Sequence, residues 1–243
     1  MVKKIVGTGV LLVLALALQA GVKMYTLKSP DGKVKLEVTA GQGIAYSLFY
    51  DGRLLLKPSR IALHTDLPEA DHWENIRITG TKQRHVSETV QAPFYRVKEF
   101  GIDCNELELR LNNGFLLLMR AYNDGMAYRF VAGRKGEMTV VEERAEFNFA
   151  DDFEAYIPYS TNPKDPWNMA FQNFYTKAPL TQYNTELPAF LPLTVDAGAV
   201  KLTLLESDLE AYPGMFVCGD GKTPALKGVF AAYPQETFKN KWR

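Results

Sequence analysis

The stretch from Asn105 to Phe130 constrains the fold more than any other part of the sequence, because it contains two tight-turn signals. The signals are Asn112-Asn113-Gly114 and Asn123-Asp124-Gly125, and such turns favour backbone angles with φ above zero. Leucines alternate with charged residues before the first signal, Phe115 to Met119 is continuously apolar, and alternation resumes after the second signal. Two turns this close together argue against a helix. The pattern predicts an antiparallel three-stranded meander. Its first strand has one solvent-exposed face, and its middle strand is covered on both faces.

Similar signals recur along the chain. Pro30-Asp31-Gly32 and Asp51-Gly52 each predict a hairpin turn, and the polar run from His64 to Glu74 predicts a loop. No segment with helical periodicity follows residue 20. Strands separated by roughly eight to twelve residues with turns between them predict an all-β sandwich. The other expected strands are Val34–Val38, Ile44–Tyr50, Arg53–Leu56, Glu88–Phe100 with a break at Pro93, Thr139–Val141, Ala145–Phe149, Leu191–Val195, Val200–Leu205, Val229–Ala232 and Phe238–Trp242.

The N-terminus has the pattern of a signal peptide. Lys3 and Lys4 precede an uncharged apolar stretch from Ile5 to Leu18, and Gln19-Ala20 offers a cleavage site. We therefore predict a signal peptide over residues 1–20, a mature domain over residues 21–243, and export to the periplasm or the extracellular space. An uncleaved anchor or a different cleavage position stays open as an alternative, because Leu18 is larger than the small residue usual at the −3 position. No later apolar run reaches about 18 residues, so no membrane span is expected after the signal is removed.

Charge and cysteine content narrow the function classes. The 28 basic and 28 acidic side chains balance, which argues against a nucleic-acid partner. Cys104 and Cys218 in an exported chain could form one disulfide or remain as two buried thiols. Three histidines, His64, His72 and His85, are scattered at spacings that favour surface roles over a metal site.

Two segments could carry function, and each has a structural alternative. Phe153 to Tyr183 is irregular and rich in proline, asparagine and aromatic residues, so its aromatic side chains either cap the end of the sandwich or face a ligand. Glu206, Asp208 and Glu210 would share one face if the preceding strand continued, and they would then either bind calcium or be solvated. The sequence contains no GxSxG, Gly-rich phosphate loop, CxxC or HExxH motif.

Several pieces of the sequence carry a resemblance to a known family. They follow the family's order over nearly all of the mature chain, and the block from Arg120 to Phe130 is the most specific. On these pieces, the chain resembles the N-terminal domain of glycoside hydrolase family 97, which comprises exported bacterial α-glucosidases and α-galactosidases. The pieces are Leu27–Gly32, Tyr50–Gly52, Asn105–Leu107, Arg120–Phe130, Ile157-Pro158, Glu206–Leu209 and Tyr212–Met215.

The resemblance implies a large antiparallel β-super-sandwich, similar to mutarotase-like carbohydrate domains, packed against a following (β/α)8 barrel. In this family the two catalytic carboxylates that a glycosidase needs lie on that barrel. We therefore expect no catalytic residue in this chain. The implied function is the N-terminal, active-site-completing and carbohydrate-binding domain of a calcium-assisted exo-α-glycosidase. Such a domain is inactive alone, and its partners are the barrel and an α-linked oligosaccharide.

The resemblance also implies site residues. In the family a glutamate from the long irregular segment joins barrel glutamates around a calcium ion, and that position falls on Gln172. A glutamine oxygen can ligate calcium but brings no charge, so its affinity should be lower. Asn184 and Thr185 lie where the family places substrate-contacting groups. The Tyr212–Met215 region leans towards the retaining, galactosidase-like members.

A second function class remains open. The chain could be a stand-alone carbohydrate-binding or assembly module, because aromatic faces such as those of the irregular segment stack on sugar rings. If the chain is instead part of a longer enzyme, the surface that meets the barrel is exposed in isolation. The isolated chain should then self-associate.

Overall fold

The computed structural model describes residues 23–133, 136–167, 172–207, 209 and 212–232. The described part is all-β, as predicted, with antiparallel sheets and two short 3-10 turns as its only helical elements. The chain forms two compact units, residues 1–144 and 145–243. The first unit holds β1 (Lys23–Lys28), β2 (Val34–Gly41), β3 (Gly43–Tyr50), β4 (Arg53–Thr65), η1 (Trp73–Asn75), β5 (Ile78–Gln91), β6 (Glu99–Leu111), β7 (Phe115–Tyr122) and β8 (Gly125–Ala132). The second unit begins within β9 (Val140–Asn148) and holds β10 (Glu154–Ile157), β11 (Thr176–Pro179), η2 (Leu180–Gln182), β12 (Leu193–Ala197), β13 (Val200–Leu204), β14 (Met215–Gly219) and β15 (Ala225–Phe230).

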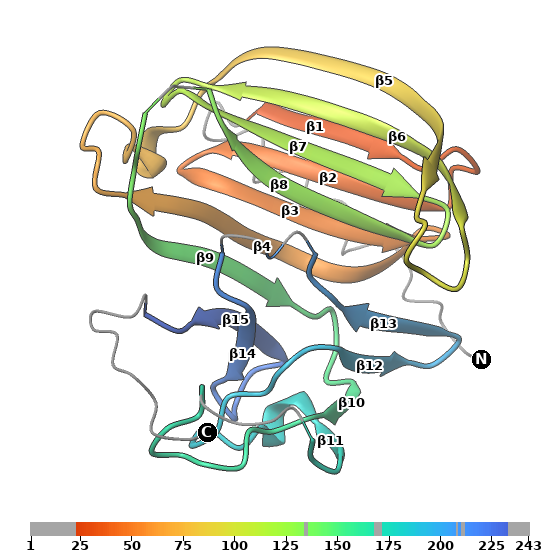
Figure 1. The fold of residues 1–243 in the computed structure, drawn as a ribbon, viewed down its shortest axis with the longest axis vertical. Helices are drawn as coiled ribbons and strands as arrows, with labels where there is room; N and C mark the ends of the chain where they lie inside the picture. The colour runs from red at the N-terminus through yellow and green to blue at the C-terminus, as the bar shows by residue number, and fades with distance from the viewer. Residues whose placement is uncertain (1–22, 134–135, 168–171, 208, 210–211, 233–243) are drawn as a thin grey trace, which may run out of the picture. The chain divides into compact units, whose positions relative to one another are not determined.

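The first unit is a sandwich of two antiparallel sheets (Figure 1). One sheet has the order β1-β2-β3-β4, and the other has the order β5-β6-β7-β8. Alternating side chains of both sheets point inward. Tyr46 of β3 and Tyr128 of β8, for example, meet with ring centroids 5.9 Å apart. Burial of these inward faces is the main stabilising term for such a sandwich.

The predicted meander is confirmed as β6, β7 and β8, but two of its details differ from the prediction. Gly114 has a φ of 86°, as the turn signal requires, whereas Gly125 is not among the glycines with positive φ and already begins β8. The middle strand is also not fully covered. Its core face is buried, but Leu116, Leu118 and Arg120 on the other face are only half-buried. A continuously apolar run therefore does not require two buried faces.

Several predicted strands are longer than expected. β4 continues through Pro58 to Thr65 instead of stopping at Leu56, because the pairing of β3 with β4 shifts there and a bulge needs no N–H from proline. The predicted loop at His64 therefore starts after Thr65. β5 begins at Ile78, ten residues before the predicted strand, and the break at Pro93 is confirmed as the turn between β5 and β6. The two strands expected around 139–149 are one strand, β9.

The second unit contains the sheet β11-β10-β12-β13, and it also contains β14 and β15 paired with the last residues of β9. The strands predicted at 191–195 and 200–205 are confirmed as β12 and β13, joined at Gly198, which has a φ of 79°. The irregular segment is more regular than expected, because β10, β11 and η2 lie within it. β15 overlaps the strand predicted at 229–232, and the strand predicted at 238–242 lies outside the described residues.

Other predictions concern the terminus and the cysteines. The predicted signal peptide, residues 1–20, lies outside the described residues. Cys104 and Cys218 are both free thiols, but only Cys104 is buried and Cys218 is half-buried. Within the described part of the chain, no helix is long and apolar enough to cross a membrane.

Candidate functional site

Tyr159, in the irregular segment, is held by hydrogen bonds to two other parts of the second unit. It follows β10 and forms an isolated antiparallel bridge with Ala189, which bridges in turn to Val217 of β14. Backbone hydrogen bonds on both sides hold this arrangement, from the Phe190 N–H to the Pro158 carbonyl at 3.0 Å and from the Ser160 N–H to the Pro188 carbonyl at 2.8 Å. The Tyr159 side chain is buried, so it serves as a rigid anchor inside the second unit.

Both segments with predicted site residues bond to this tyrosine. The Asn173 amide nitrogen donates to the Tyr159 carbonyl at 2.8 Å, and the Asn184 N–H donates to the Tyr159 hydroxyl at 2.8 Å. Gln172 directly precedes Asn173, and Thr185 directly follows Asn184. The structure therefore ties the segments of all three predicted site residues to one anchor, although Gln172 lies twelve or more positions before Asn184 and Thr185 in sequence.

Tyr183 supports the anchor from the other side. Its ring meets that of Tyr159 in a T-shaped contact with centroids 5.0 Å apart. Its hydroxyl donates towards the Leu187 carbonyl at 3.1 Å and the Val217 carbonyl at 2.7 Å. Burial raises the pKa of Tyr159, and it raises the pKa of Tyr183 far above the usual range of a phenol. Both phenols therefore stay protonated at neutral pH and act as hydrogen-bonding supports rather than as bases.

Two glycines make room for this arrangement, and neither was singled out from the sequence. A Cβ at Gly219 would lie 2.7 Å from Cγ of Tyr183, closer than real Cβ contacts. Gly221 has a φ of 67°, and its built Cβ would lie 3.2 Å from Cγ2 of Thr185. Only the fold reveals these requirements, because β14 and the turn after it are far from Tyr183 in sequence.

The predicted contact residues themselves are accessible. Gln172, Asn184 and Thr185 are all exposed. The Asn184 carboxamide oxygen accepts the Glu186 N–H at 3.1 Å, which stabilises a turn from Asn184 to Leu187. The site therefore consists of three exposed residues, Gln172, Asn184 and Thr185, hereafter the rim, whose segments are held by the buried Tyr159.

The aromatic residues of the segment divide between the two predicted roles. Tyr159 is buried, and Trp167 packs against Phe216 with centroids 4.9 Å apart although it is 39% exposed, so these rings stabilise the fold. Phe174 and Tyr175 are exposed, and the Phe174 side chain is 94% accessible. Both exposed rings lie within three residues of Gln172, which places ligand-accessible aromatic surface beside the rim.

A calcium site does not fit the described residues taken alone. Gln172 supplies one neutral oxygen, and in the described ranges no three His, Cys, Asp or Glu side chains converge. Ser160, next to Tyr159, has a buried hydroxyl with no hydrogen-bond partner among the described residues. Calcium takes 6–8 oxygen ligands, so most of them would have to come from elsewhere.

The acidic cluster predicted after β13 is not a continued strand. β13 ends at Leu204, and both oxygens of Glu206 accept the Met215 N–H, at 2.9 and 2.8 Å. Burial raises the pKa of Glu206, and the hydrogen bond from Met215 only partly offsets that effect. Glu206 therefore ties β14 to the preceding segment. Asp208 and Glu210 lie outside the described residues.

A buried ion cluster in the first unit was also missed by sequence reasoning. Glu106 belongs to the predicted solvent-exposed face, yet it is only 3% exposed. Its two oxygens accept from Arg84 Nε at 2.6 Å and from Arg120 Nε at 2.8 Å. Burial by itself would raise the pKa of Glu106, but the two arginines outweigh burial and the net direction is downward. The pKa of Arg120 is raised by Tyr122 and by Glu106, so the cluster is charged at neutral pH.

Two of the three histidines lie beside nearby polar side chains. His64 Nδ1 lies 2.6 Å from an Asp71 oxygen, and His85 lies between Asn105 and Asp103. His85 also lines an open groove of about 480 Å³ along β1, β5 and β6. The Gln83 and Asn105 amides at this groove already donate to carbonyls of β1, at 3.0 and 2.8 Å. These polar groups therefore join the two sheets.

Comparison with known proteins gives consistent results. The sequence model of a family described as Glycosyl-hydrolase 97 N-terminal matches residues 27–243. A "Retaining alpha-galactosidase" from Bacteroides thetaiotaomicron is 39% identical over 229 residues, which are 91% of this chain and 34% of that protein. A "Probable retaining alpha-galactosidase" from Streptomyces bingchenggensis is 26% identical over 158 residues, which are 63% of this chain and 24% of that protein. The chain thus spans about a third or less of the length of these relatives.

Solved structures support the fold. A glycoside hydrolase family 97 enzyme from Pseudoalteromonas sp. strain K8, solved in complex with acarbose, matches with a TM-score of 0.70 and 18% identity. That match covers 85% of this chain and 32% of the other. A beta-arabinopyranosidase matches with a TM-score of 0.73 and 20% identity, covering 86% of this chain and 35% of the other. At such identities these matches bear on the fold alone.

Proposed function

Because the chain belongs to the glycosyl-hydrolase 97 N-terminal family, we propose that it is the active-site-completing and carbohydrate-binding domain of an exo-acting α-glycosidase, inactive alone. The observation that carries the proposal is the family match over residues 27–243. The acid and the base or nucleophile would then lie on a barrel that follows this domain in a longer protein, hereafter the full-length enzyme. Export to the periplasm or beyond remains part of the proposal.

We favour α-galactosides as the substrate class and keep α-glucosides as the alternative. Both curated relatives are named as retaining α-galactosidases or probable ones. In the proposed role, the rim at Asn184 and Thr185 positions the sugar, and the buried Tyr159 keeps that rim in place. A rim preorganised in this way lowers the entropy lost when substrate binds.

Calcium enters only as a shared site of the full-length enzyme. When bound, the ion would supply positive charge near the sugar. Gln172 would contribute one neutral oxygen, and carboxylates from the barrel would complete the shell. On this proposal, calcium added to the isolated chain leaves its melting temperature unchanged. A clear rise would show a complete site in this chain and would contradict the proposal.

Substitutions in the rim test the active-site role. In the full-length enzyme, Asn184→Ala and Thr185→Ala should each lower kcat/KM for an aryl α-galactoside by about tenfold, because lost transition-state contacts reduce that ratio directly. Lys227→Ala is the matched control, because Lys227 is exposed on β15 of the same unit. Rim variants that behave like this control would contradict the role of Asn184 and Thr185.

The exposed aromatic rings favour a second candidate function, a stand-alone carbohydrate-binding or assembly module. Phe174 and Tyr175 offer accessible ring faces of the kind that stack on sugars. Calorimetric titration of the isolated chain with maltooligosaccharides and galactosides decides this point. Binding heat at millimolar sugar would support the module if Phe174→Ala abolishes it. The absence of any binding heat would contradict a carbohydrate-binding module.

A further inference from the structure

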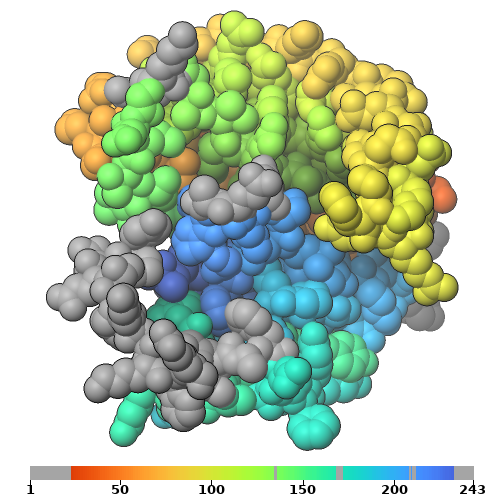
Figure 2. Space-filling model, viewed as in Figure 1, coloured from red at the N-terminus to blue at the C-terminus, as the bar shows by residue number. Residues whose placement is uncertain are grey.

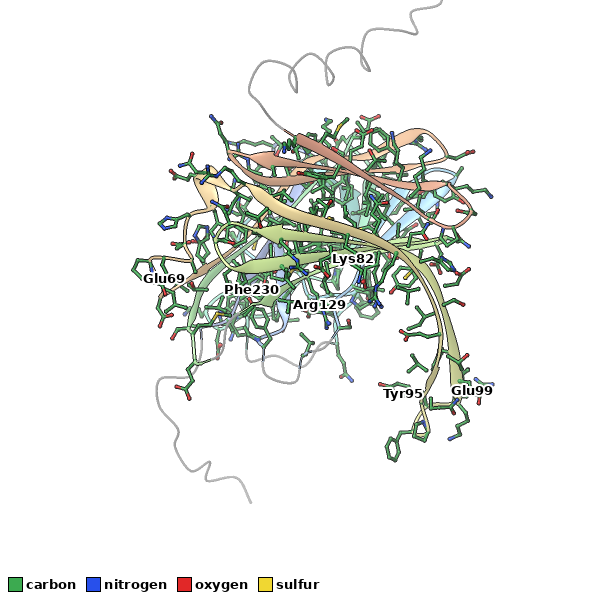
Figure 3. All side chains as sticks on the ribbon, turned by 90° about the horizontal axis from the view of Figure 1, so that it is seen from above. Glu69, Lys82, Tyr95, Glu99, Arg129 and Phe230 are labelled. Carbon is green, nitrogen blue, oxygen red and sulfur yellow. The ribbon has the colours of Figure 1, made fainter. Side chains whose placement is uncertain are left out.

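The long hairpin of β5 and β6 extends beyond the rest of the first unit. Its outer part, residues 86–104, is a two-stranded ribbon, hereafter the ribbon. The two strands stay in register along it, with Val86 opposite Cys104, Val90 opposite Phe100 and Gln91 opposite Glu99. Figure 3 shows the ribbon bending away from the sheets, with Tyr95 and Glu99 at its far end. Figure 2 shows its outer part, in yellow, as a projection at one side.

The ribbon has one apolar face and one polar face. Because cross-strand partners share a face and successive residues alternate, its sequence can be sorted directly. The polar face carries Ser87, Thr89, Gln91, Glu99, Gly101 and Asp103. The other face is apolar except for Glu88, and it carries Val86, Val90, Phe100, Ile102 and Cys104.

The apolar face is buried near the body and uncovered further out. Cys104 and Val86 are buried, whereas Val90 is 41% exposed and Phe100 is 44% exposed. The alternation that normally marks a strand lying on a core therefore continues onto a part of the hairpin that has no core beneath it. A two-stranded ribbon with a bare apolar face is only marginally stable in water. Such a face is typical of a surface that packs against another folded part.

The tip of the ribbon also exposes large apolar side chains. Phe94 is 97% exposed and Tyr95 is 69% exposed. Hydrogen bonds close the turn beneath them, from the Ala92 N–H to the Lys98 carbonyl at 2.7 Å and from the Tyr95 N–H to the Ala92 carbonyl at 3.0 Å. The Gln91 amide adds a bond to Glu99 at 2.9 Å. The exposed rings are thus presented by a closed turn at the end of the apolar face.

We propose that the apolar face and tip of the ribbon pack against the part of the full-length enzyme that lies outside this chain. The chain matches only 34% of the Bacteroides relative and 32–35% of two solved relatives, so most of each relative could provide such a surface. The inference rests on the proposed function only in assuming that the catalytic part follows this domain.

Hydrogen–deuterium exchange on the isolated chain and on the full-length enzyme tests the proposal without any activity assay. Amides from Val90 to Phe100 should exchange at least about tenfold more slowly in the full-length enzyme, because packing suppresses local opening. The double variant Val90→Ser, Phe100→Ser should remove that slowing. The matched control Ser87→Ala, Thr89→Ala changes the opposite face of the same strand and should keep it.

Three results would overturn the proposal. Equal exchange in the two wild-type proteins would show that nothing in the full-length enzyme covers the ribbon. Slowing in the full-length enzyme that appears only as its concentration rises would assign the face to a second copy. Slowing that survives in the double variant would exclude the apolar face. Phe94→Ser, at an almost fully exposed position, replaces the double variant if that one does not fold. An inactive full-length enzyme would contradict the proposed function, but the hydrogen–deuterium exchange comparison would still test whether the ribbon is covered.

Discussion

Glu106 shows that the neighbours of a residue in space can reverse what its sequence pattern indicates. It alternates with leucines and was predicted to face water, yet Arg84 and Arg120 clamp both of its oxygens. These arginines come from β5 and β7, on either side of β6. The sequence shows the charges but not that strand pairing brings them together.

We expect Glu106→Gln to lower the free energy of unfolding by about 2 kcal/mol. Breaking a buried ion pair costs about 3–5 kcal/mol. Part of that cost is recovered here because Arg84 is half exposed and water can solvate it. Urea unfolding of the isolated chain measures the change. Glu108→Gln is the control, because the ion pair of Glu108 is with the exposed Arg110, and it should change stability by less than about 0.5 kcal/mol. Equal effects of the two substitutions would contradict the special role of Glu106.

The same carboxylate predicts a pH dependence. The folded-state pKa of Glu106 is lowered, so its contribution is fully present above the unfolded-state pKa of about 4.3 and is lost as pH falls through the lower folded-state value. The stability difference between wild type and Glu106→Gln should therefore be constant from neutral pH down to about pH 5 and shrink below about pH 4. Unfolding curves at several pH values check this. A difference that grows on acidification would show that the sign is wrong.

At the scale of elements, the two turns of the meander were read from the same kind of signal but have different backbones. Gly114 has a φ of 86°, where a side chain is strained, and Gly125 does not have a positive φ. A Cβ at either position meets nothing within 4 Å. The difference between them is therefore purely conformational.

Gly114→Ala should accordingly destabilise the chain by about 1 kcal/mol, because an L-residue is disfavoured at that backbone angle. Gly125→Ala should leave stability within about 0.5 kcal/mol of wild type, because its backbone suits a side chain and the surrounding space is open. Thermal or urea unfolding of the isolated chain compares them. A larger loss for Gly125→Ala would contradict the assignment of the two turns.

Much of the element order could be predicted because hairpin turns and alternating apolar residues are recognisable in the local sequence. Asp51-Gly52, Gly114 and Gly198 each join adjacent strands, and the alternation of Leu107, Leu109 and Leu111 identifies their core face. Strand ends were less predictable. β4 passes through Pro58 and β5 extends to Ile78 because their partner strands supply pairing that local propensity does not show.

The candidate site was predictable only in part. Gln172, Asn184 and Thr185 came from a family resemblance, and their shared link to Tyr159 required the fold. Nothing local marks Tyr159 as an anchor, because its partners at Asn173 and Asn184 are 14 and 25 residues away. Gly219 was missed for the same reason, since its contact with Tyr183 joins distant segments.

At the scale of the whole molecule, the exposed apolar surface should govern how the isolated chain behaves. The ribbon exposes Phe94 and Phe100, and the second unit exposes Phe174 and Leu205. Monomeric proteins seldom leave so many large apolar side chains in water without a partner surface.

We therefore expect the isolated chain to self-associate as its concentration rises, since no net charge opposes association near its pI of about 6.8. Size exclusion with light scattering should show a mass that increases with concentration. Phe174→Ser and Phe94→Ser should each reduce that increase. A constant monomer mass at high protein concentration would contradict the expectation.

The central claim is that this chain completes a glycosidase but does not itself cleave glycosides. Hydrolysis of aryl α-galactosides and α-glucosides by the isolated chain and by the full-length enzyme tests it most directly. The account predicts turnover by the full-length enzyme, and for the isolated chain it predicts only the background rate seen without protein. Turnover by the purified isolated chain would contradict it, and so would a full-length enzyme that cleaves neither substrate.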